Sequence, residues 1–327
     1  MTKNNLTLNS IFKKILILGL VAISIFGITT NISTQAVKQK NLKYFGYYAT
    51  NSGELNNSNI SEIGKLNNSN TIVVDYSPNI ILDTVRKAEK SKLKIILHVS
   101  GYFFDYSVKP TILRSDYISL TSALKDKLGQ NISQIQSFYF DEPLWQGISK
   151  SDFKSITLAL KQNFPDTARM SVEAIAPLRT NTPYTSPYGI SNIYLDSDYL
   201  EYITDVGFDY FVFSCQSTDR SHQSVLDILQ TLANKNQNIW LIPDGAINLS
   251  CNSDSSLLRK SLTYYYNIAK INPRVVGILS WTYSGYTPSQ TIENIGYIGL
   301  KDIFNQNSQY YDKEIRNEHI KIGKNIT

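Results

Sequence analysis

Short apolar segments alternate with longer polar segments along most of the chain. The apolar segments are rich in β-branched and aromatic residues and contain few polar positions, which is typical of parallel strands buried on both faces. They cover residues 44–48, 71–75, 93–99, 137–141, 169–174, 210–214, 238–242 and 275–281. We therefore expect eight buried strands, one for each of these segments.

The segments between these strands have the apolar spacing of amphipathic helices. Helical patterns cover residues 80–89, 115–128, 152–164, 223–236 and 254–271, and a last, highly charged helix is expected over 308–321. Ser151 is placed as the N-cap of the helix at 152–164. Eight strands that alternate with helices predict an α/β protein with a single (β/α)8 TIM barrel over residues 37–327. A dinucleotide-binding sheet is disfavoured, because residues 46–53 lack the required glycine spacing.

Residues 1–36 have the order of an export signal. Lys3, Lys13 and Lys14 precede an apolar run over 15–28, and small and polar residues follow up to Ala36. The run is shorter than the ~20 apolar residues of a membrane span. We expect a cleaved signal peptide and a secreted or cell-surface protein, with an uncleaved N-terminal anchor as the alternative.

Composition and charge narrow the range of partners. The 32 basic and 27 acidic residues give a net charge of +5, and loss of the three signal lysines leaves 29 − 27 = +2. A chain so close to neutrality indicates neither a nucleic acid partner nor a membrane contact other than the anchor. The 22 tyrosines suit a wet, aromatic-lined surface. We expect a monomer that acts on carbohydrate and needs no cofactor.

In a barrel of this kind, functional groups lie at the C-terminal ends of the strands and in the loops that follow. Those positions hold many ionisable, amide and aromatic side chains, more than a purely structural barrel needs. They are Tyr47, Tyr48, Asp75, Tyr76, His98, Tyr102, Asp141, Glu142, Glu173, Ser214, Gln216, Asp244, Trp281 and Tyr283. We expect them to form one site.

The most informative segment is Phe140-Asp141-Glu142-Pro143, at the end of the fourth predicted strand. Successive strand residues face opposite sides, so at most one of Asp141 and Glu142 points along the barrel axis. This segment resembles the strand-four Asn-Glu-Pro of clan A glycoside hydrolases. The resemblance implies a glycosidase in which Glu142 is the general acid/base and Trp281 stacks on sugar. The chain departs from that pattern in having Asp141 in place of the asparagine and no glutamate at the end of strand seven.

Glycoside cleavage needs two carboxyl groups, ~5–5.5 Å apart for retention and ~6.5–9.5 Å apart for inversion. Asp244 stands where the clan A nucleophile would be, and Glu173 lies within the fifth strand, with Asp75 as a further candidate. A buried glutamate needs a partner, and Arg169 and Arg179 are the two basic candidates for Glu173.

The aromatic and histidine candidates have alternative, structural roles. Tyr47, Tyr102, Trp145, Tyr283 and Tyr286 are placed to bind sugar, although any one of them alone fits ordinary surface packing. His98 is expected to be a hydrogen-bonded residue of the barrel mouth rather than a metal ligand, since no second histidine has ligand spacing.

The chain has two cysteines, Cys215 and Cys251, and we expect a disulfide between them. Both follow neighbouring strands on the C-terminal face, and the bridge would close about 36 residues and stabilise the fold by ~2–4 kcal/mol. Two free thiols in the denatured, unreduced protein would rule it out.

Three functions fit these residues. The first is an exported glycoside hydrolase that uses Glu142 with Asp141, Asp244 or Glu173, on a substrate bound by Asp75, His98, Gln216 and the aromatic residues. The second is a catalytically silent surface barrel that binds glycan or protein. The third is a metal-dependent hydrolase that uses Asp75, Asp141, Glu142 and His98. Release of reducing sugar that a chelator does not affect favours the first function. Glycan binding without turnover favours the second, and loss of activity in chelator favours the third.

Overall fold

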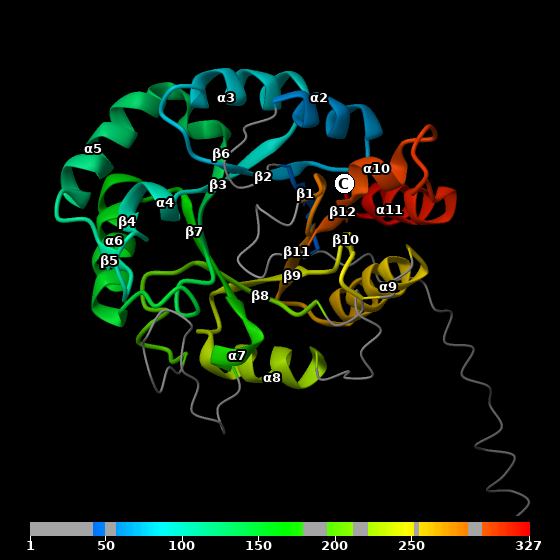
Figure 1. Cartoon of the computed structure of the whole chain (residues 1–327). Helices are drawn as coiled ribbons and strands as arrows, with labels where there is room; N and C mark the ends of the chain where they lie inside the picture. The colour runs from blue at the N-terminus through cyan, green and yellow to red at the C-terminus, as the bar shows by residue number, and fades with distance from the viewer. Residues whose placement is uncertain (1–41, 50–56, 179–194, 212–221, 252–254, 287–295) are drawn as a thin grey trace, which may run out of the picture. The chain divides into compact units, whose positions relative to one another are not determined.

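The structure is a computed structural model, and it describes residues 42–49, 57–178, 195–211, 222–251, 255–286 and 296–327. Eight parallel strands form a closed barrel in the order β1-β11-β9-β8-β7-β6-β3-β2 (Figure 1). They are β1 (Tyr44–Tyr48), β2 (Thr71–Asp75), β3 (Lys94–His98), β6 (Ile135–Asp141), β7 (Ala168–Ala174), β8 (Asp205–Asp209), β9 (Asn238–Ile242) and β11 (Val275–Ser280). β1 pairs with both β2 and β11, which closes the barrel. The predicted (β/α)8 barrel is confirmed.

Helices surround the barrel, as the amphipathic pattern predicts (Figure 1). The longer ones are α2 (Asn57–Leu66), α3 (Ile81–Lys90), α5 (Tyr117–Leu128), α6 (Lys150–Asn163), α8 (His222–Leu232), α9 (Ser255–Ile271) and α11 (Lys313–Ile326). The N-cap of α6 is Ser149, whose side chain accepts from the Asp152 backbone N–H at 3.1 Å, and not Ser151 as expected. The helix therefore begins two residues earlier than its apolar face suggests.

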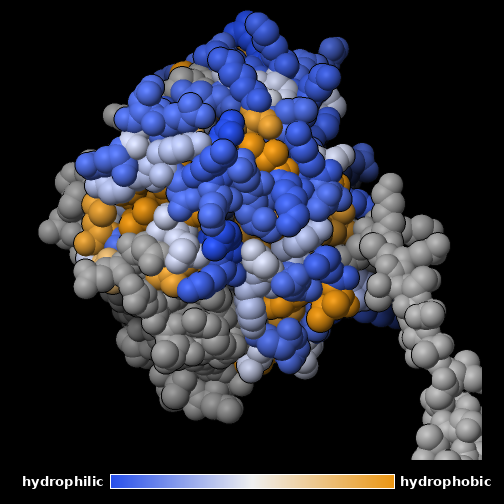
Figure 2. Space-filling model, turned by 90° about the vertical axis from the view of Figure 1, so that its right-hand side faces the viewer, coloured by the Kyte–Doolittle hydropathy of each residue, from blue (hydrophilic) through white to orange (hydrophobic). Residues whose placement is uncertain are grey.

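Shorter elements complete the described chain. They are α4 (Ser100–Phe103), η1 (Gly129–Gln134), α7 (Ile175–Leu178), α10 (Leu300–Phe304), and the small sheets β4 (Phe104–Asp105) with β5 (Ile112–Leu113) and β10 (Ala246–Asn248) with β12 (Tyr297–Gly299). On the side where α9, α10 and α11 lie, the surface is mostly hydrophilic with small separate apolar patches (Figure 2). In the described part of the chain, no helix has both the length and the apolar composition needed to span a bilayer. The predicted signal at 1–36 lies outside the described residues and stays a prediction.

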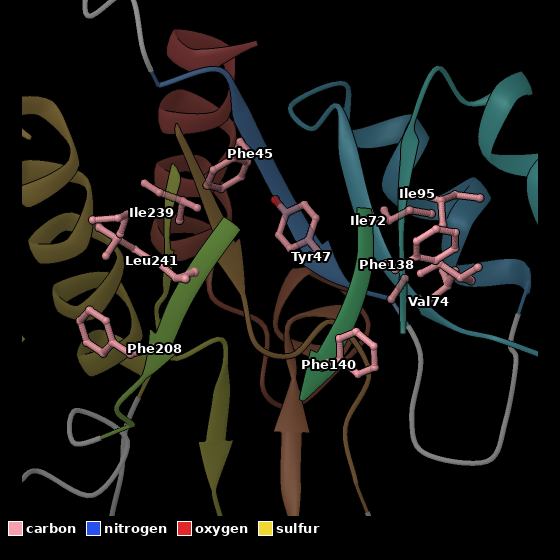
Figure 3. Close-up of a cluster of buried hydrophobic side chains, with 14 of the residues drawn as sticks. Phe45, Tyr47, Ile72, Val74, Ile95, Phe138, Phe140, Phe208, Ile239 and Leu241 are labelled. Carbon is pink, nitrogen blue, oxygen red and sulfur yellow. The ribbon is translucent and has the colours of Figure 1, made fainter. Parts of the chain in front are cut away.

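Alternation along the strands produces two apolar layers. One set of side chains points outward to the helices, including Phe45, Tyr47, Val74, Phe140 and Phe208 (Figure 3). The other set fills the barrel interior, and comprises Tyr48, Val73, Ile96, Tyr139, Met170, Val172, Trp240, Ile242, Val276 and Leu279. Residues two positions further along a strand face the same way. The parity of this interior set therefore decides which side chains enter the barrel mouth.

The sixth strand differs from the expectation. It is Asp205–Asp209, five residues before the predicted segment at 210–214. The predicted segment is the more apolar of the two, whereas the actual strand has the sequence Asp-Val-Gly-Phe-Asp. Asp205 accepts from the Trp240 indole N–H at 2.9 Å, so an acidic residue is satisfied inside the barrel where the pattern demanded an apolar one.

Helix α11 is fixed to the barrel by a buried histidine. His319 is fully buried and stacks on Tyr47 at 6.1 Å between ring centroids, and its Nδ1–H donates to the Ile315 carbonyl at 3.0 Å. Burial lowers the pKa of His319 to about 4. The ring is therefore neutral in the folded protein at pH 7.

We expect this histidine to make the fold acid-sensitive. Between about pH 6.5 and 4 the unfolded chain binds a proton at His319 that the folded protein does not, so stability falls as pH falls. His319→Phe should remove up to ~3 kcal/mol of this loss. Urea unfolding at pH 7, 5.5 and 4 measures it, and an equal pH slope in parent and variant would contradict it.

Candidate active site

Asp75, His98 and Asp141 come together at the C-terminal end of the barrel. Each ends its strand with the parity of the interior set, and β2 pairs with β3 in the register that places Asp75 beside His98. The His98 Nδ1 atom lies 2.7 Å from Asp75 Oδ1. Burial by itself would lower the pKa of His98, but the Asp75 hydrogen bond and charge, with Asp141, raise it above the ordinary value. His98 is a hydrogen-bonded residue of the barrel mouth, as expected.

Asp141 is the strand-four carboxylate that points into the barrel. Its Oδ1 accepts from the Tyr139 hydroxyl, and the Tyr139 oxygen in turn accepts from the Tyr48 hydroxyl at 2.8 Å. Burial raises the pKa of Asp141, while the His98 charge and the Tyr139 hydrogen bond act in the opposite direction. Both tyrosines face the barrel interior. The sequence analysis did not predict that they hydrogen-bond to each other or to Asp141.

Glu142 turns away from the strand direction at the same place. Its φ is +43°, a left-handed conformation that is uncommon for a residue with a side chain, and its N–H donates to Val172 O at 2.7 Å. The Glu142 carboxyl is hydrogen-bonded to the carboxyl of Asp209, the last residue of β8. Burial, together with the neighbouring carboxylates, raises the pKa of both groups well above their ordinary values. Both carboxyl groups therefore keep their protons to higher pH than exposed carboxyl groups do.

Asp209 is the site residue that the sequence interpretation missed. The sixth strand was predicted five residues too late, so that Ser214 and Gln216 were expected at its end. Asp209 is the residue that ends this strand. Gln216 and Ser214 lie outside the described residues. The alternating acidic and apolar residues of Asp205–Asp209 are the signal that could have identified this strand and its terminal carboxylate.

Glu173 and Asp244 are buried carboxyl groups with hydrogen-bond partners in the protein. Both side chains are only 1% exposed. Glu173 accepts from Ser171 Oγ at 3.1 Å and from the Leu144 backbone N–H at 3.3 Å. Asp244 Oδ2 accepts from Ser261 Oγ of α9 at 2.8 Å. Each of the two carboxyl groups is thus held by the protein rather than presented to a ligand.

The expectation that Arg169 is a candidate basic partner of Glu173 is wrong. Arg169 donates to the backbone carbonyls of Tyr202 at 2.6 Å and Thr167 at 2.9 Å, at the opposite end of its strand from Glu173. Arg179 lies outside the described residues. Burial instead raises the pKa of Glu173 well above its ordinary value, so that a proton takes the place of a counter-ion.

Several aromatic residues line the same end of the barrel. Trp281 is half-buried and stacks on Phe211 at 4.7 Å and on Tyr286 at 5.8 Å between ring centroids, and the Trp281–Thr282 peptide bond is cis. Tyr102 meets Tyr76 edge-on at 4.6 Å. Trp145, in the loop after β6, is also half-buried. These rings supply an aromatic border next to the carboxyl groups.

Two of the predicted sugar-binding tyrosines are corrected. Tyr47 is fully buried and Tyr283 is 4% exposed, and they contact each other with ring centroids 5.7 Å apart. The Tyr47 hydroxyl accepts from Asn68 Nδ2 at 2.8 Å on the outside of the barrel. For Tyr47 the reason is strand parity, because Tyr48 and not Tyr47 faces the interior.

One of the two cysteines, Cys251, lies within the described residues. Cys251 is disulfide-bonded, while Cys215, the only other cysteine in the sequence, lies outside the described residues. The pairing of these two cysteines stays a prediction. Within the described ranges, no three His, Cys, Asp or Glu side chains are grouped as metal ligands would be.

The buried carboxyls predict an unusual pH dependence of stability. Glu142, Glu173 and Asp209 have raised pKa values, so the folded protein holds protons that the unfolded chain has released above about pH 4. Stability from these groups is complete at low pH and is lost as pH rises through their raised pKa values. Asp209→Asn should reduce this loss and make the protein more stable than the parent at pH 8. Urea unfolding from pH 5 to 8 measures the two slopes; a variant less stable than the parent at pH 8 would contradict the assignment.

Comparisons with known proteins give no family by sequence. No family model and no curated protein matches the chain. Solved structures do match. The native xylanase 10B from Thermotoga maritima aligns with a TM-score of 0.53 and 13% identity over 86% of this chain and 95% of that one.

Two further matches are larger proteins. The β-D-glucuronidase of Dictyoglomus thermophilum gives a TM-score of 0.58 at 12% identity, and the β-galacturonidase of Eisenbergiella tayi bound to galacturonate gives 0.55 at 10%. They align with 87% and 86% of this chain, which spans about half of each, 50% and 51% respectively. At these identities the likeness concerns the fold. The chain therefore has the (β/α)8 barrel fold found in many glycoside hydrolases.

Proposed function

We propose that this protein is an exported glycoside hydrolase that cleaves a polysaccharide or glycoconjugate, with Glu142 as general acid. The observation that carries the proposal is the hydrogen-bonded carboxyl pair of Glu142 and Asp209 next to Asp141 in the barrel mouth. Carboxyl groups with strongly raised pKa values cluster at functional sites, because a buried acid that keeps its proton is costly and has chemical use.

The environments of the mouth carboxyls suggest different roles. Glu142 holds a proton that it can transfer to a glycosidic oxygen, and Asp209 is its hydrogen-bond partner. A carboxyl in hydrogen-bond contact with Glu142 is closer than the ~5–5.5 Å that separates a pair flanking the scissile bond. We therefore assign Asp209 the role of hydrogen-bond partner to the general acid Glu142, and not that of nucleophile or base at the anomeric carbon.

Asp141 is the better second carboxylate. Glu173 and Asp244 are almost fully buried and bound by the protein, and Asp75 is bound to His98. Asp141 remains partly exposed at the mouth, and no described residue donates to its Oδ2 atom. We assign it the anionic role, as nucleophile or as base for water.

Substrate class and location complete the proposal. A half-buried aromatic border beside carboxyl groups suits a sugar ring, whose C–H face packs on aromatic rings while its hydroxyls bind carboxylates. The export signal expected at 1–36 supports a location outside the cell or at its surface, where such glycans are met. The matched structures include enzymes named for xylan, glucuronide and galacturonide substrates, which supports carbohydrate as the ligand class.

Product analysis tests this function. Purified mature protein is incubated with a panel of polysaccharides and glycoconjugates in the presence of a chelator, and released reducing ends are measured. We expect release that the chelator does not change. Loss of release in chelator would favour the metal-dependent alternative, and no release from any glycan would contradict the proposal.

A silent glycan-binding barrel is the second candidate. It is favoured by one observation, that the strand-seven carboxyl of Asp244 is turned to Ser261 and buried. Glycan binding in the same panel without any release of reducing ends would support it.

A further inference from the structure

We propose that Tyr139, supported by Tyr48, is the positioning residue that fixes the Asp141 carboxylate in the barrel mouth, so that two adjacent carboxyls act as one base and one acid. The inference rests on the proposed function for its kinetic consequence, but the arrangement itself can be measured without any substrate. It concerns two interior tyrosines with no contact to the Glu142–Asp209 pair in the hydrogen bonds described.

The hydrogen bonds form a chain with one direction. Asp141 Oδ1 is an acceptor, so the Tyr139 hydroxyl must donate to it, and the Tyr139 oxygen is then free to accept from Tyr48 at 2.8 Å. Tyr48 lies on β1 and Tyr139 on β6, on opposite sides of the β2–β3 segment of the barrel. A chain of two donors that ends on a carboxylate stabilises the charged form and fixes its orientation.

Burial makes this chain obligatory. Tyr139 is 1% exposed and Tyr48 is 9% exposed, and both belong to the apolar interior set with Val73, Ile96 and Val172. A phenol hydroxyl without a partner in such surroundings costs free energy. Tyr48 therefore hydrogen-bonds to Tyr139, and Tyr139 to Asp141. The packing of the interior set around the two tyrosines thus fixes the orientation of the Asp141 carboxylate.

Asp141 and Glu142 meet different neighbours. The titratable groups described around Asp141 are Tyr48 of β1, Asp75 of β2, His98 of β3, Tyr139 of β6, Glu142 after β6, Glu173 of β7 and Asp209 of β8. Of these, His98 and Tyr139 favour the charged form of Asp141. Glu142, by contrast, faces carboxyl groups, which favour its protonated form. Asp141 and Glu142 are adjacent in sequence, and the different side chains around them favour the charged form of Asp141 and the protonated form of Glu142.

The arrangement leaves one oxygen for the ligand. Tyr139 occupies Oδ1, and the Asp141 backbone N–H contacts Ser100 Oγ at 3.4 Å. Among the described residues none donates to Oδ2. That oxygen is the acceptor that a substrate hydroxyl, a substrate N–H or an attacking water would meet next to the acid Glu142.

Tyrosine-to-phenylalanine variants test the positioning role. In Tyr139→Phe we expect the acidic limb of the pH profile of kcat/KM to move up by about 1–2 pH units, since a hydrogen bond to a charged group is lost. Tyr48→Phe should move it in the same direction by less, because Tyr139 can still donate. Tyr47→Phe is the matched control: it is the same change on β1, the strand of Tyr48, but on the outer face of the barrel, where the hydroxyl binds Asn68.

A direct titration separates this inference from the proposed function. Carbon-13 labelling of aspartate carboxyls, with Asp141→Asn for assignment, gives the pKa of Asp141 by NMR in the absence of substrate. We expect the same upward shift in Tyr139→Phe and none in Tyr47→Phe. The double variant Tyr48→Phe/Tyr139→Phe, which leaves no orphan hydroxyl, replaces Tyr139→Phe if the single variant fails to fold. An Asp141 pKa unchanged in the folded variants would overturn the inference, even if the enzyme proves to be a glycosidase.

Discussion

Glu142→Gln is expected to lower kcat/KM on a natural glycan by about 10²–10⁴-fold, the usual contribution of a general acid. The amide keeps the shape of the side chain and can still donate to Asp209, but it cannot protonate a leaving group. The loss should be smaller on an aryl glycoside whose leaving group is a weak base, because that bond breaks with less protonation. Steady-state kinetics on both substrates measure the two losses.

The matched control for this experiment is Glu89→Gln. Glu89 is an exposed glutamate of α3 that accepts a long hydrogen bond from Gln134 at 3.4 Å, away from the barrel mouth. Its replacement should leave kcat/KM unchanged within experimental error. Near-native turnover by Glu142→Gln would show that the acid is another group, and Asp141 would then be the first to examine.

Trp240→Ala is expected to destabilise the fold by about 3–5 kcal/mol, as other truncations of a buried tryptophan do. Trp240 is 1% exposed inside the barrel, stacks on Tyr44 at 5.3 Å, and donates its indole N–H to Asp205 at 2.9 Å. The truncation removes the ring and leaves a buried carboxylate with one donor fewer. Gly277 is the complementary small residue, since a Cβ there would lie 2.2 Å from the indole ring.

Urea unfolding measures this effect, with Ile271→Ala as the control. Ile271 is 81% exposed at the end of α9, so its truncation should change stability by no more than about 0.5 kcal/mol. A loss in Trp240→Ala of similar size to that in Ile271→Ala would mean that the barrel interior is not packed around this ring.

Most of the barrel could be predicted because parallel strands buried on both faces are encoded as short apolar runs. The strands at 44–48, 71–75 and 238–242 were predicted with their observed limits. The sixth strand could not be placed in this way, because its interior face carries Asp205 and Asp209 rather than apolar side chains. Its acidic residues are satisfied by tertiary partners such as Trp240, which local pattern does not reveal.

The candidate site was predictable in part for a related reason. Asp141, Glu142, Asp75 and His98 follow from the strand ends, and the structure brings them together. The pairing of Glu142 with Asp209 depends on the left-handed conformation of Glu142 and on the position of β8. The first has no local signal in the sequence, and the second has only the acidic and apolar alternation of Asp205–Asp209. Tyr47 was predicted to bind sugar and Tyr48 was not. The two are adjacent tyrosines with the same local sequence signal, and only the strand parity of the folded barrel shows that Tyr48 faces the interior.

Hydrolysis in water enriched in oxygen-18 tests the central claim most directly. Protonation of the glycosidic oxygen by Glu142 implies cleavage between the anomeric carbon and that oxygen, with water attacking the carbon. We expect mass spectrometry to find the label at the newly formed reducing end, on the fragment that carries the attacked anomeric carbon, while the leaving-group fragment keeps the unlabelled glycosidic oxygen. No comparable products are expected with Glu142→Gln. Label at the new hydroxyl of the leaving-group fragment instead of the new reducing end, or glycan bound and recovered intact, would contradict the account.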